Sequence, residues 1–484
     1  MNHYYKKNVV IIGGGPAGLG AALMLAQRGW KDITVIEKRP SADYYEPDKS
    51  FSYQIDGRGQ KLTDLLKLTP KLANVSVPST DFYFTLIQKD GTRKTTKLPI
   101  ADSKRKTAYW LPRASFIELL YQEIQHHWQD EIKVLFNTEC IEIKQHLEHL
   151  EIITQSRDNK PLTLTPTLLV GCDGLNSIVR QTLHEWEKGQ SNSFEMQKFS
   201  SPSSGLKYKV LTLPPQFPLS EQEGDVAQST MAYAIRSTFK ERKKAINLGL
   251  LPLKNPNQPR TANIITYPDH QIWQLETPVD VEQFLKQAFP QIPLEKIIDP
   301  EEIARFTSSE GGKFPIPQYC SGLYQIWGNP EESQGTAVIL LGDAVHCFPP
   351  DIGQGVNSAL EDIYIFQEIL SETKDNLSEA LPRYQNLRQP DIKALIRLGQ
   401  ISYPWQYNQD PLRKKLWSIN FFMRLLLNRL FPFLFNTHSF IMIQNHELSY
   451  SDILAKSNRT TQVLSILGGL GGLAILTLLL KLMN

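Results

Sequence analysis

The stretch Val9–Leu23 constrains the fold of this chain more than any other part of its sequence. Residues 9–12 are four apolar side chains, a pattern typical of a buried parallel strand. Gly13, Gly15 and Gly18 follow in the spacing G-x-G-x-x-G, and an Ala- and Leu-rich segment that predicts a helix comes directly after them. A strand, a glycine turn and a helix in this order indicate a doubly wound α/β fold.

Each glycine of this turn has its own physical role. Gly13 permits a tight turn, Gly15 lets a pyrophosphate approach the backbone, and Gly18 lets the helix pack closely on the strand. The helix N-terminus, where Pro16 and Ala17 lie, offers free N–H groups and a partial positive charge to phosphates. We therefore predict that these five residues bind a dinucleotide.

A carboxylate stands where a dinucleotide site requires one. A second strand, residues 33–36, ends at Glu37, about the right distance from the glycines for its side chain to bind a ribose hydroxyl. Lys38 and Arg39 follow, and Arg39 either reaches the nucleotide or is a solvated loop residue. Arg113 begins a later helix and is either a ligand contact or a surface residue.

Two further buried strands each end at a carboxylate. The strand from Leu168 leads to Asp173, and the strand 337–341 leads to Gly342 and Asp343. Ligands in open α/β sheets bind at the carboxyl ends of the strands. Asp343 can accept hydrogen bonds from a polyol chain, so we expect both carboxylates at the same ligand site.

The segment after Asp343 is suited to a flat ring. Gly353 and Gly355 allow the backbone to lie against such a ring, and the helix predicted from Val356 can stabilise negative charge on it through its N-terminus. We interpret His346 as a structural residue at the strand end. The sequence has no acid/base dyad, no side-chain nucleophile and no metal-ligand spacing that we would assign a catalytic role.

Composition narrows the classes of partner and compartment. The 484 residues carry 52 Lys and Arg against 50 Asp and Glu, so the net charge of +2 gives no reason to expect a nucleic-acid partner. Four scattered cysteines without C-x-x-C spacing argue against disulfides and structural zinc and for a reducing compartment. The basic N-terminus and the following apolar run are explained by the first strand, so we do not predict secretion.

The C-terminus differs from the rest of the chain. Residues 463–480 contain no charge and are just long enough to span a bilayer. Gly468 and Gly472 fit G-x-x-x-G, a helix-pairing motif in membranes. We favour a single-pass tail anchor in the lipid bilayer, with the catalytic part on the cytoplasmic side, over a buried core helix. Residues 413–435 are expected at the membrane interface, over the substrate cavity or in a core helix.

We predict an α/β protein with a Rossmann-type nucleotide domain, an inserted antiparallel substrate domain, a C-terminal helical region and a transmembrane helix. The expected boundaries are 1–80, 113–190 and 307–400 for the nucleotide domain, 81–112 and 205–306 for the substrate domain, 401–458 for the helical region and 463–482 for the membrane span.

The motifs taken together resemble a known family. They read Gly13-x-Gly15-x-x-Gly18 with Glu37, then Cys172-Asp-Gly-x-x-Ser-x-Val-Arg180, then Gly342-Asp-Ala-x-His346 followed by Pro350-x-x-Gly-Gln-Gly-x-Asn357 and Glu361-Asp362. In this order they resemble the single-component FAD-dependent aromatic hydroxylases, the group A flavoprotein monooxygenases, over about the first 400 residues.

The resemblance implies a role for each matched position. Residues 13, 15, 18, 37 and 39 would hold the ADP half of FAD, and Arg113 would lie near the flavin. Asp173 would serve FAD and a transiently bound NADPH or NADH, and Asp343 would bind the ribityl chain. Gly353, Gly355, Val356 and Asn357 would face the isoalloxazine.

Within the group, the chain is similar to the kynurenine 3-monooxygenases. Asn357 and Tyr450 match their substrate-contacting positions. Those enzymes place an Arg and a Tyr in the hairpin before the flavin arginine, whereas this chain reads Phe82–Ile87 and Leu98–Ile100 there. The missing carboxylate clamp suggests a more lipophilic substrate, such as a quinone precursor, a polyprenyl compound or a sterol-like alkene.

The resemblance implies a monooxygenase that uses NAD(P)H and O₂ to hydroxylate or epoxidise an aromatic or lipophilic small molecule, through a hydroperoxide formed on the reduced flavin. Two other functions stay open. One is an FAD-dependent reductase or dehydrogenase of a polyprenyl or quinone-type lipid, which would incorporate no oxygen. The other is a catalytically idle flavoprotein that serves as a scaffold at a membrane. NADPH would not reduce the FAD bound to such a protein.

Overall fold

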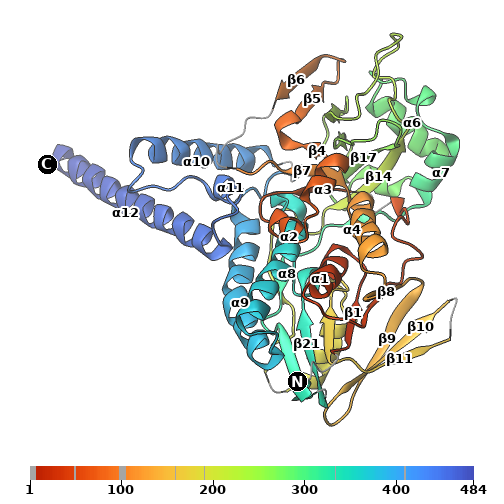
Figure 1. Ribbon diagram of the computed structural model, residues 1–484. Coiled ribbons are helices and arrows are strands. Elements are labelled where there is room, and N and C mark those ends of the chain that lie inside the picture. The colour runs from red at the N-terminus through yellow and green to blue at the C-terminus, as the bar shows by residue number, and fades with distance from the viewer. Residues whose placement is uncertain are drawn as a thin grey trace.

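The computed structural model shows a molecule organised around two large β-sheets, with two long helices extending from one side (Figure 1). The structure describes residues 7–47, 51–97, 105–157, 160–189, 191–332, 334–407 and 410–483. Within these ranges, the side chains of residues 81 and 470–483 are not described.

The first sheet has six strands, of which five run parallel and the edge strand β20 is antiparallel. In spatial order they are β20 (Tyr324–Asn329), β21 (Gln334–Leu340), β12 (Leu168–Gly171), β1 (Val9–Ile12), β2 (Ile33–Ile36) and β8 (Ile132–Leu135). Val9 pairs with Leu168 on one side and Ile33 on the other. Because the four central strands are parallel neighbours, the segments after them leave from the same edge of the sheet.

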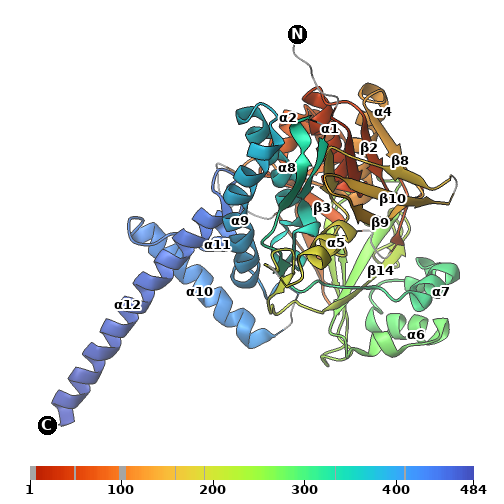
Figure 2. The same ribbon diagram turned by 90° about the horizontal axis from the view of Figure 1, so that it is seen from below.

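Helices cover this sheet (Figures 1 and 2). The three helices that begin at Pro16, Gly355 and Leu377 pack side by side. The helices are α1 (Pro16–Gln27), α4 (Arg113–His127), α5 (Ile178–Glu187), α8 (Gly355–Glu372) and α9 (Leu377–Ile401). Helix α1 is apolar almost all round, and residues 17–26 are buried. It lies against α8, so the helix that follows the first motif contacts the helix that follows the last one.

The second sheet has seven strands and gathers residues from distant parts of the chain. Its order is β18 (Gly312–Lys313), β14 (Lys207–Leu213), β17 (Arg260–Thr266), β16 (Asn247–Leu250), β15 (Ala232–Arg236), β5 (Tyr83–Ile87) and β6 (Arg93–Lys97). The hairpin of β5 and β6 joins the sheet through a parallel pairing of β5 with β15. Residues 98–100, which we expected in this hairpin, lie outside the described residues.

Helices α6 (Pro278–Ala288) and α7 (Pro300–Ser308) cover the outer side of the seven-stranded sheet (Figure 1). Its alternating strands bury a second hydrophobic core that is separate from the core of the parallel sheet. The two sheets are therefore the centres of two structural units.

Smaller elements connect and flank these units. The strands are β3 (Ser52–Ile55), β7 (Tyr109–Pro112) and β4 (Val77–Pro78) in one sheet, β9 (Thr138–Gln145), β10 (Leu150–Ser156) and β11 (Leu162–Leu164) in another, and β13 (Gln197–Lys198), β19 (Gln318–Tyr319) and β22 (His346–Cys347) in a third. Short helices α2 (Gln60–Leu65) and α3 (Thr69–Val75) follow β3.

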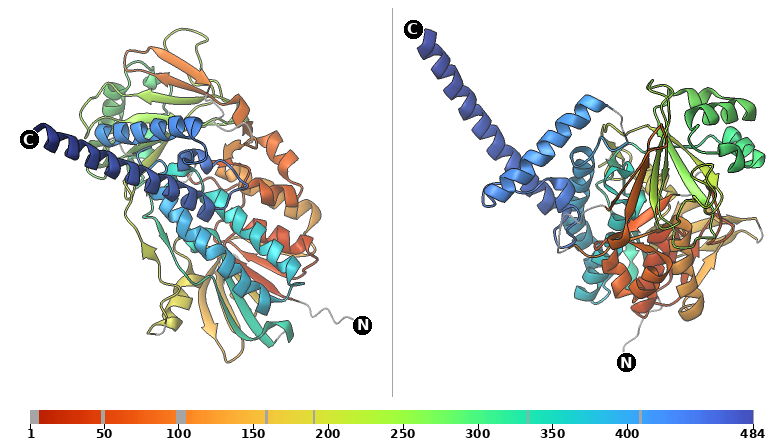
Figure 3. Two further views of the ribbon diagram at one scale, coloured as in Figure 1. Left: turned by 90° about the vertical axis from the view of Figure 1, so that its left-hand side faces the viewer. Right: turned by 90° about the horizontal axis from the view of Figure 1, so that it is seen from above.

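The C-terminal region consists of α10 (Pro411–Leu430), α11 (Ser439–Met442) and α12 (Tyr450–Met483). Helix α12 begins against the body and carries the chain away from it, with α10 beside it (Figure 3). The guanidinium of Arg424 on α10 joins the two helices, because it donates to Thr461 Oγ1 at 2.8 Å and to Ser457 O at 3.3 Å.

The predicted membrane span over 463–482, and with it the single-pass tail anchor, is wrong. In the part of the chain that the structure describes, no helix combines the length and the apolar character that crossing a bilayer requires. The apolar run is not a helix of its own: it continues α12, whose first turns carry Asp452, Lys456 and Arg459. The side chains beyond residue 469 lie outside the described part.

Candidate active site

The first and second motifs meet backbone to backbone at the edge of the parallel sheet. A Cβ atom added to Gly13 would lie 2.4 Å from the carbonyl oxygen of Cys172, and the φ of Gly13 is +104°. A Cβ at Gly18 would lie 1.8 Å from the carbonyl oxygen of Gly13. Only glycine fits either position, so the turn itself requires both residues. Their predicted contact with a dinucleotide stays a prediction.

Four other glycines border open space. At Gly15, Gly174, Gly353 and Gly355, an added Cβ atom would meet nothing within 4 Å. They come from all three motifs, which the sheet brings to one edge. Gly15 is also the N-cap of α1 and provides no side-chain cap, so the first N–H groups of α1 have no capping side chain. This arrangement fits a diphosphate and a flat ring lying on bare backbone.

Glu37 lies beside the first turn as a hydrogen-bonded carboxylate. It accepts from the backbone N–H groups of Gly14 and Arg39 at 2.7 and 2.8 Å, and from Arg39 Nε at 3.0 Å. Burial acts to raise the pKa of Glu37, but the hydrogen bonds and charge of Arg39 outweigh it and the pKa is lowered. Lys38 is exposed.

Arginine, tyrosine and carboxylate side chains form a series of contacts that begins at Arg39. Glu46 Oε2 lies 3.9 Å from Arg39 Nη1 and 3.7 Å from Arg113 Nη1. Tyr53 is hydrogen-bonded to Arg113, and its pKa is raised by burial and, after it, shifted by the charges of Arg113 and Asp343. The Asp343 side chain is accessible, yet surrounding protein raises its pKa. An accessible side chain with a raised pKa fits a carboxylate that lines a recess.

The second motif is tied to the third through its own polar groups. Asp173 Oδ2 accepts from the N–H of Ile178 at 2.6 Å, while its Oδ1 has no partner among the described residues. Burial raises the pKa of Asp173. Arg180 donates to the carbonyl oxygens of Leu175 and Ala344, each at 3.0 Å. Arg180 therefore holds the loop of Asp173 against the loop of Asp343.

A network of buried charged side chains holds the third motif in place. Asp362 Oδ2 bonds His346 Nε2 and accepts from the N–H of Gly342, both at 2.8 Å, and its Oδ1 accepts from Arg388 Nε at 2.7 Å. Arg388 also donates to Glu361 at 3.0 Å. All the side chains in this network are almost fully buried. The network fixes the loop that carries Asp343 and agrees with a structural role for His346.

Asn357 is fully buried and its amide is occupied within the protein. Its Oδ1 accepts from the N–H of Asp56 at 3.0 Å, and its Nδ2 donates to the carbonyl oxygens of Gln54 and Gly353 at 2.8 and 3.0 Å. Asn357 thus locks the glycine loop onto β3. Its predicted contacts with flavin and substrate stay predictions. Val356 is half-buried at the same helix start.

Tyr450, the other predicted substrate residue, is also fully buried. Its hydroxyl donates to Gln354 Oε1 at 2.8 Å, and Gln354 Nε2 donates to Asp56 Oδ2 at 2.8 Å. The guanidinium of Arg58 lies 4.1 Å from the centre of the Tyr450 ring. Tyr450 therefore connects the start of α12 to the glycine loop, and its predicted substrate contact stays a prediction.

Sequence reasoning missed several residues at this site. No sequence motif includes Glu46, Tyr53 or Arg58. Arg58 donates to Glu361, which is 303 positions away in the sequence, at 2.7 Å. The sequence offers a weak signal for Arg58 alone, an arginine between two glycines just after an alternating segment. Asp351, inside the third motif, was not singled out either.

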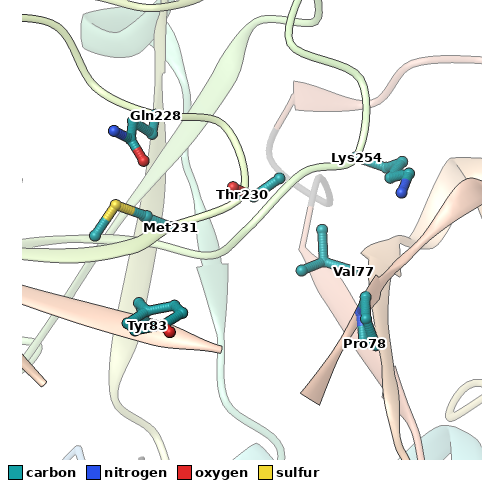
Figure 4. A pocket seen from close by; sticks show the side chains of 7 residues that line it. All are labelled: Val77, Pro78, Tyr83, Gln228, Thr230, Met231 and Lys254. Carbon is teal, nitrogen blue, oxygen red and sulfur yellow. The ribbon is translucent and has the colours of Figure 1, made fainter. Parts of the chain in front are cut away.

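A separate cavity of about 530 Å³ lies between β4 and the unit built on the seven-stranded sheet (Figure 4). Val77 and Pro78 border one side of it, and Tyr83 and Met231 border the other. None of its lining residues belongs to the three motifs, so it is distinct from the glycine-lined space.

The fold and the glycine-lined edge define a dinucleotide-binding flavoprotein, and comparison with known families agrees. A sequence model of the family described as "FAD binding domain" matches residues 6–219 and 331–398, which is more than half of the chain. The chain belongs to this family. Its cofactor is FAD, with NAD(P)H as co-substrate, and it is a flavoprotein monooxygenase, as the sequence predicted.

Individual relatives extend over nearly the whole chain. Kynurenine 3-monooxygenase of Salinispora arenicola is 23% identical over 477 residues, covering 97% of this chain and 95% of that protein. Violacein synthase of Chromobacterium violaceum is 24% identical, covering 87% and 89%. The structure of 2-methyl-3-hydroxypyridine-5-carboxylic acid oxygenase superposes with a TM-score of 0.59 at 18% identity, covering 88% and 96%. This last likeness supports the α/β FAD-binding fold.

Proposed function

We propose that this monooxygenase inserts one oxygen atom of O₂ into a small aromatic molecule bound beside the glycine loop 353–355. The similarity to kynurenine 3-monooxygenases and to an oxygenase of a hydroxypyridine, both named for aromatic substrates, supports this class of substrate. The observation that carries the proposal is the convergence of three chain segments at one sheet edge, with bare glycine backbone facing open space.

The residues present fit FAD, and each has a proposed task. The N-terminus of α1 with Gly15, Pro16 and Ala17 would bind the diphosphate, and Glu37 would accept hydrogen bonds from the adenosine ribose. Arg39 holds Glu37 ionised for that purpose. Bound FAD supplies the redox chemistry, which is hydride uptake from NAD(P)H followed by oxygen transfer from O₂.

The remaining motif residues would serve the ribityl chain and the ring. Asp343, accessible in its recess, would accept hydrogen bonds from the ribityl hydroxyls, and Arg113 would lie beside the ring with Tyr53 orienting its guanidinium. Asp173, whose Oδ1 has no partner among the described residues, would accept a hydrogen bond from a hydroxyl of FAD or of NAD(P)H. The N-terminus of α8 would stabilise negative charge on the reduced ring.

The hairpin favours a substrate without an amino-acid carboxylate. The only arginine of the described strands β5 and β6 is Arg93, and its guanidinium is paired with Asp225, with Nη1 2.6 Å from Oδ1. No arginine of these two strands therefore offers an unpaired guanidinium to a carboxylate. We accordingly place the substrate among aromatic molecules whose side chain is neutral.

The test uses the purified full chain loaded with FAD. NADPH oxidation and O₂ uptake are followed with kynurenine and with neutral aromatic ketones, and ¹⁸O₂ labelling shows whether oxygen enters the product. We expect substrate-stimulated O₂ uptake and one labelled oxygen atom in the product, with a neutral ketone preferred over kynurenine. Anaerobic turnover without label would instead establish a reductase or dehydrogenase, and FAD that NADPH does not reduce would establish an idle flavoprotein.

A further inference from the structure

Asp351 is a buried carboxylate that the FAD-binding motifs do not explain. It lies in the turn Pro350–Ile352, directly before Gly353, in the loop that joins β22 to α8. Its side chain is only 2% exposed. The turn therefore places a carboxylate inside the protein, two residues from a glycine that borders open space.

One oxygen of this carboxylate has a partner and the other has none. Oδ1 accepts a hydrogen bond from Ser203 Oγ at 2.7 Å, and the same hydroxyl lies 3.2 Å from the carbonyl oxygen of Pro404. Oδ2 has no hydrogen-bond partner in the described part of the chain. Buried polar atoms in folded proteins almost always have one, so this oxygen points to a donor that the described residues do not provide.

The surroundings of Asp351 are aromatic. Burial, and after it the charge of Asp351, raises the pKa of both Tyr403 and Tyr407, the two titratable side chains that sense this carboxylate. The Tyr407 ring meets the edge of Phe314 at 5.3 Å, and Phe314 lies 5.7 Å from Tyr208 on β14. The carboxylate thus lies near two tyrosines, and Tyr407 begins a row of ring contacts that reaches the seven-stranded sheet, which suits a flat aromatic ligand.

The protonation state of Asp351 is compatible with binding, and a cavity lies against residues next in sequence to its neighbours. Burial raises the pKa of Asp351 to about 7, although the hydrogen bond from Ser203 opposes this. The group is therefore substantially ionised in slightly basic solution and accepts hydrogen bonds there. A cavity of about 350 Å³ lies against Pro202 and Trp405, the neighbours in sequence of Ser203 and Pro404.

We propose that Oδ2 of Asp351 accepts a hydrogen bond from an N–H or O–H group attached to the substrate's aromatic ring and thereby selects substrates that carry such a group. This inference rests on the proposed function and adds to it the chemical feature that the site recognises. A ring hydroxyl or amine that donates to a carboxylate also becomes more electron-rich, which favours attack by an electrophilic oxygen donor.

Three probes differ only in this group: 3-aminoacetophenone, 3-hydroxyacetophenone and 3-methoxyacetophenone. Their dissociation constants are measured at pH 8 from the change in the absorption spectrum of bound FAD, without NADPH. We expect wild type to bind the amine and the phenol at least tenfold more tightly than the ether. In Asp351→Asn the amide oxygen keeps the bond from Ser203 and the N–H₂ replaces Oδ2, so we expect the ether to bind as well as the phenol or better.

Two controls separate this effect from misfolding and from loss of charge. Asp269→Asn removes a carboxylate at an exposed position. It should bind the three probes with the same order of affinities as wild type. Asp351→Asn should retain wild-type FAD content. Equal binding of the three probes by wild type, no spectral response to any of them, or an unchanged order in Asp351→Asn would overturn the assignment. Selective binding of donors without oxygen incorporation would instead contradict the proposed function alone.

Discussion

At the scale of single residues, two glycines of the first motif have opposite consequences when they are replaced. Gly15 has an ordinary φ of −80° and open space at its Cβ position, so Gly15→Val should fold normally while its side chain enters the space proposed for the diphosphate. Gly13→Ala would force a Cβ against Cys172 in a left-handed conformation and should destabilise the fold itself.

The measurement compares FAD content with thermal unfolding of the FAD-free proteins. We expect Gly15→Val to lose FAD without a fall in the Tm of the apoprotein, and Gly13→Ala to lower that Tm by more than 5 °C or to prevent soluble expression. FAD retained by Gly15→Val at the wild-type level would contradict the proposed placement of the diphosphate.

Asp351 gives a second prediction at this scale, because its pKa is about 7 in the folded protein and 3.8 when unfolded. Between these values the folded state holds a proton that the unfolded state has released. Stability therefore falls as pH rises from about 4 to 7. Asp351→Asn removes this penalty, so its stability relative to wild type should increase by about 3 kcal/mol between pH 5 and pH 8.

Chemical denaturation at the two pH values checks this expectation. Ser203→Ala removes the hydrogen bond that opposes the shift and should raise the pKa of Asp351 further, which extends the loss of stability to higher pH. A free-energy difference between wild type and Asp351→Asn that does not vary with pH would show that this carboxyl titrates normally.

At the scale of elements, the sequence predicts what local pattern encodes. The strands at 9–12, 168–171 and 334–340 are buried parallel strands, and runs of apolar residues before Gly or Asp reveal them without any tertiary information. Arg58 could not be found in this way, because its partner Glu361 is 303 positions distant. Tyr450 was predicted only from the family resemblance, and the hydrogen bond to Gln354, 96 positions away, is not encoded locally. The membrane prediction failed because no helix of the described residues is both long enough and apolar enough to cross a bilayer. The apolar run forms the C-terminal part of α12, whose start is polar.

The contact between α8 and α9 depends on Arg388, which is fully buried and paired with Glu361 and Asp362. The charges of these carboxylates overcome burial and raise the pKa of Arg388, so the arginine stays charged. Arg388→Leu leaves two buried carboxylates without this partner and should cost about 3–5 kcal/mol of unfolding free energy. Tyr450→Phe removes one neutral hydrogen bond to Gln354 and should cost only about 1 kcal/mol.

Urea denaturation of both variants, followed by tryptophan fluorescence, tests this ranking. The tyrosine variant is the matched control, since it alters a fully buried residue of the same region without removing a charge. Equal losses in the two variants would mean that the ion pairs contribute no more than a single hydrogen bond.

At the scale of the whole molecule, FAD should act as a link between segments that are distant in the chain. The space it would occupy is bordered by Gly15, Gly174 and Gly353, so one ligand would bridge three loops of the same sheet edge. A ligand that binds only the folded state stabilises it in proportion to the logarithm of its concentration, by about 2.7 kcal/mol at 100 times its dissociation constant.

We therefore expect the Tm of the apoprotein to rise steadily as FAD is added in excess, and the Tm of Gly15→Val to stay constant over the same range. FMN, which lacks the adenosine and half of the diphosphate, should produce a smaller rise because it leaves Glu37 and the N-terminus of α1 without a ligand. Differential scanning calorimetry measures both series. A Tm of the wild-type chain that does not change with FAD concentration would show that the three loops form no common binding site.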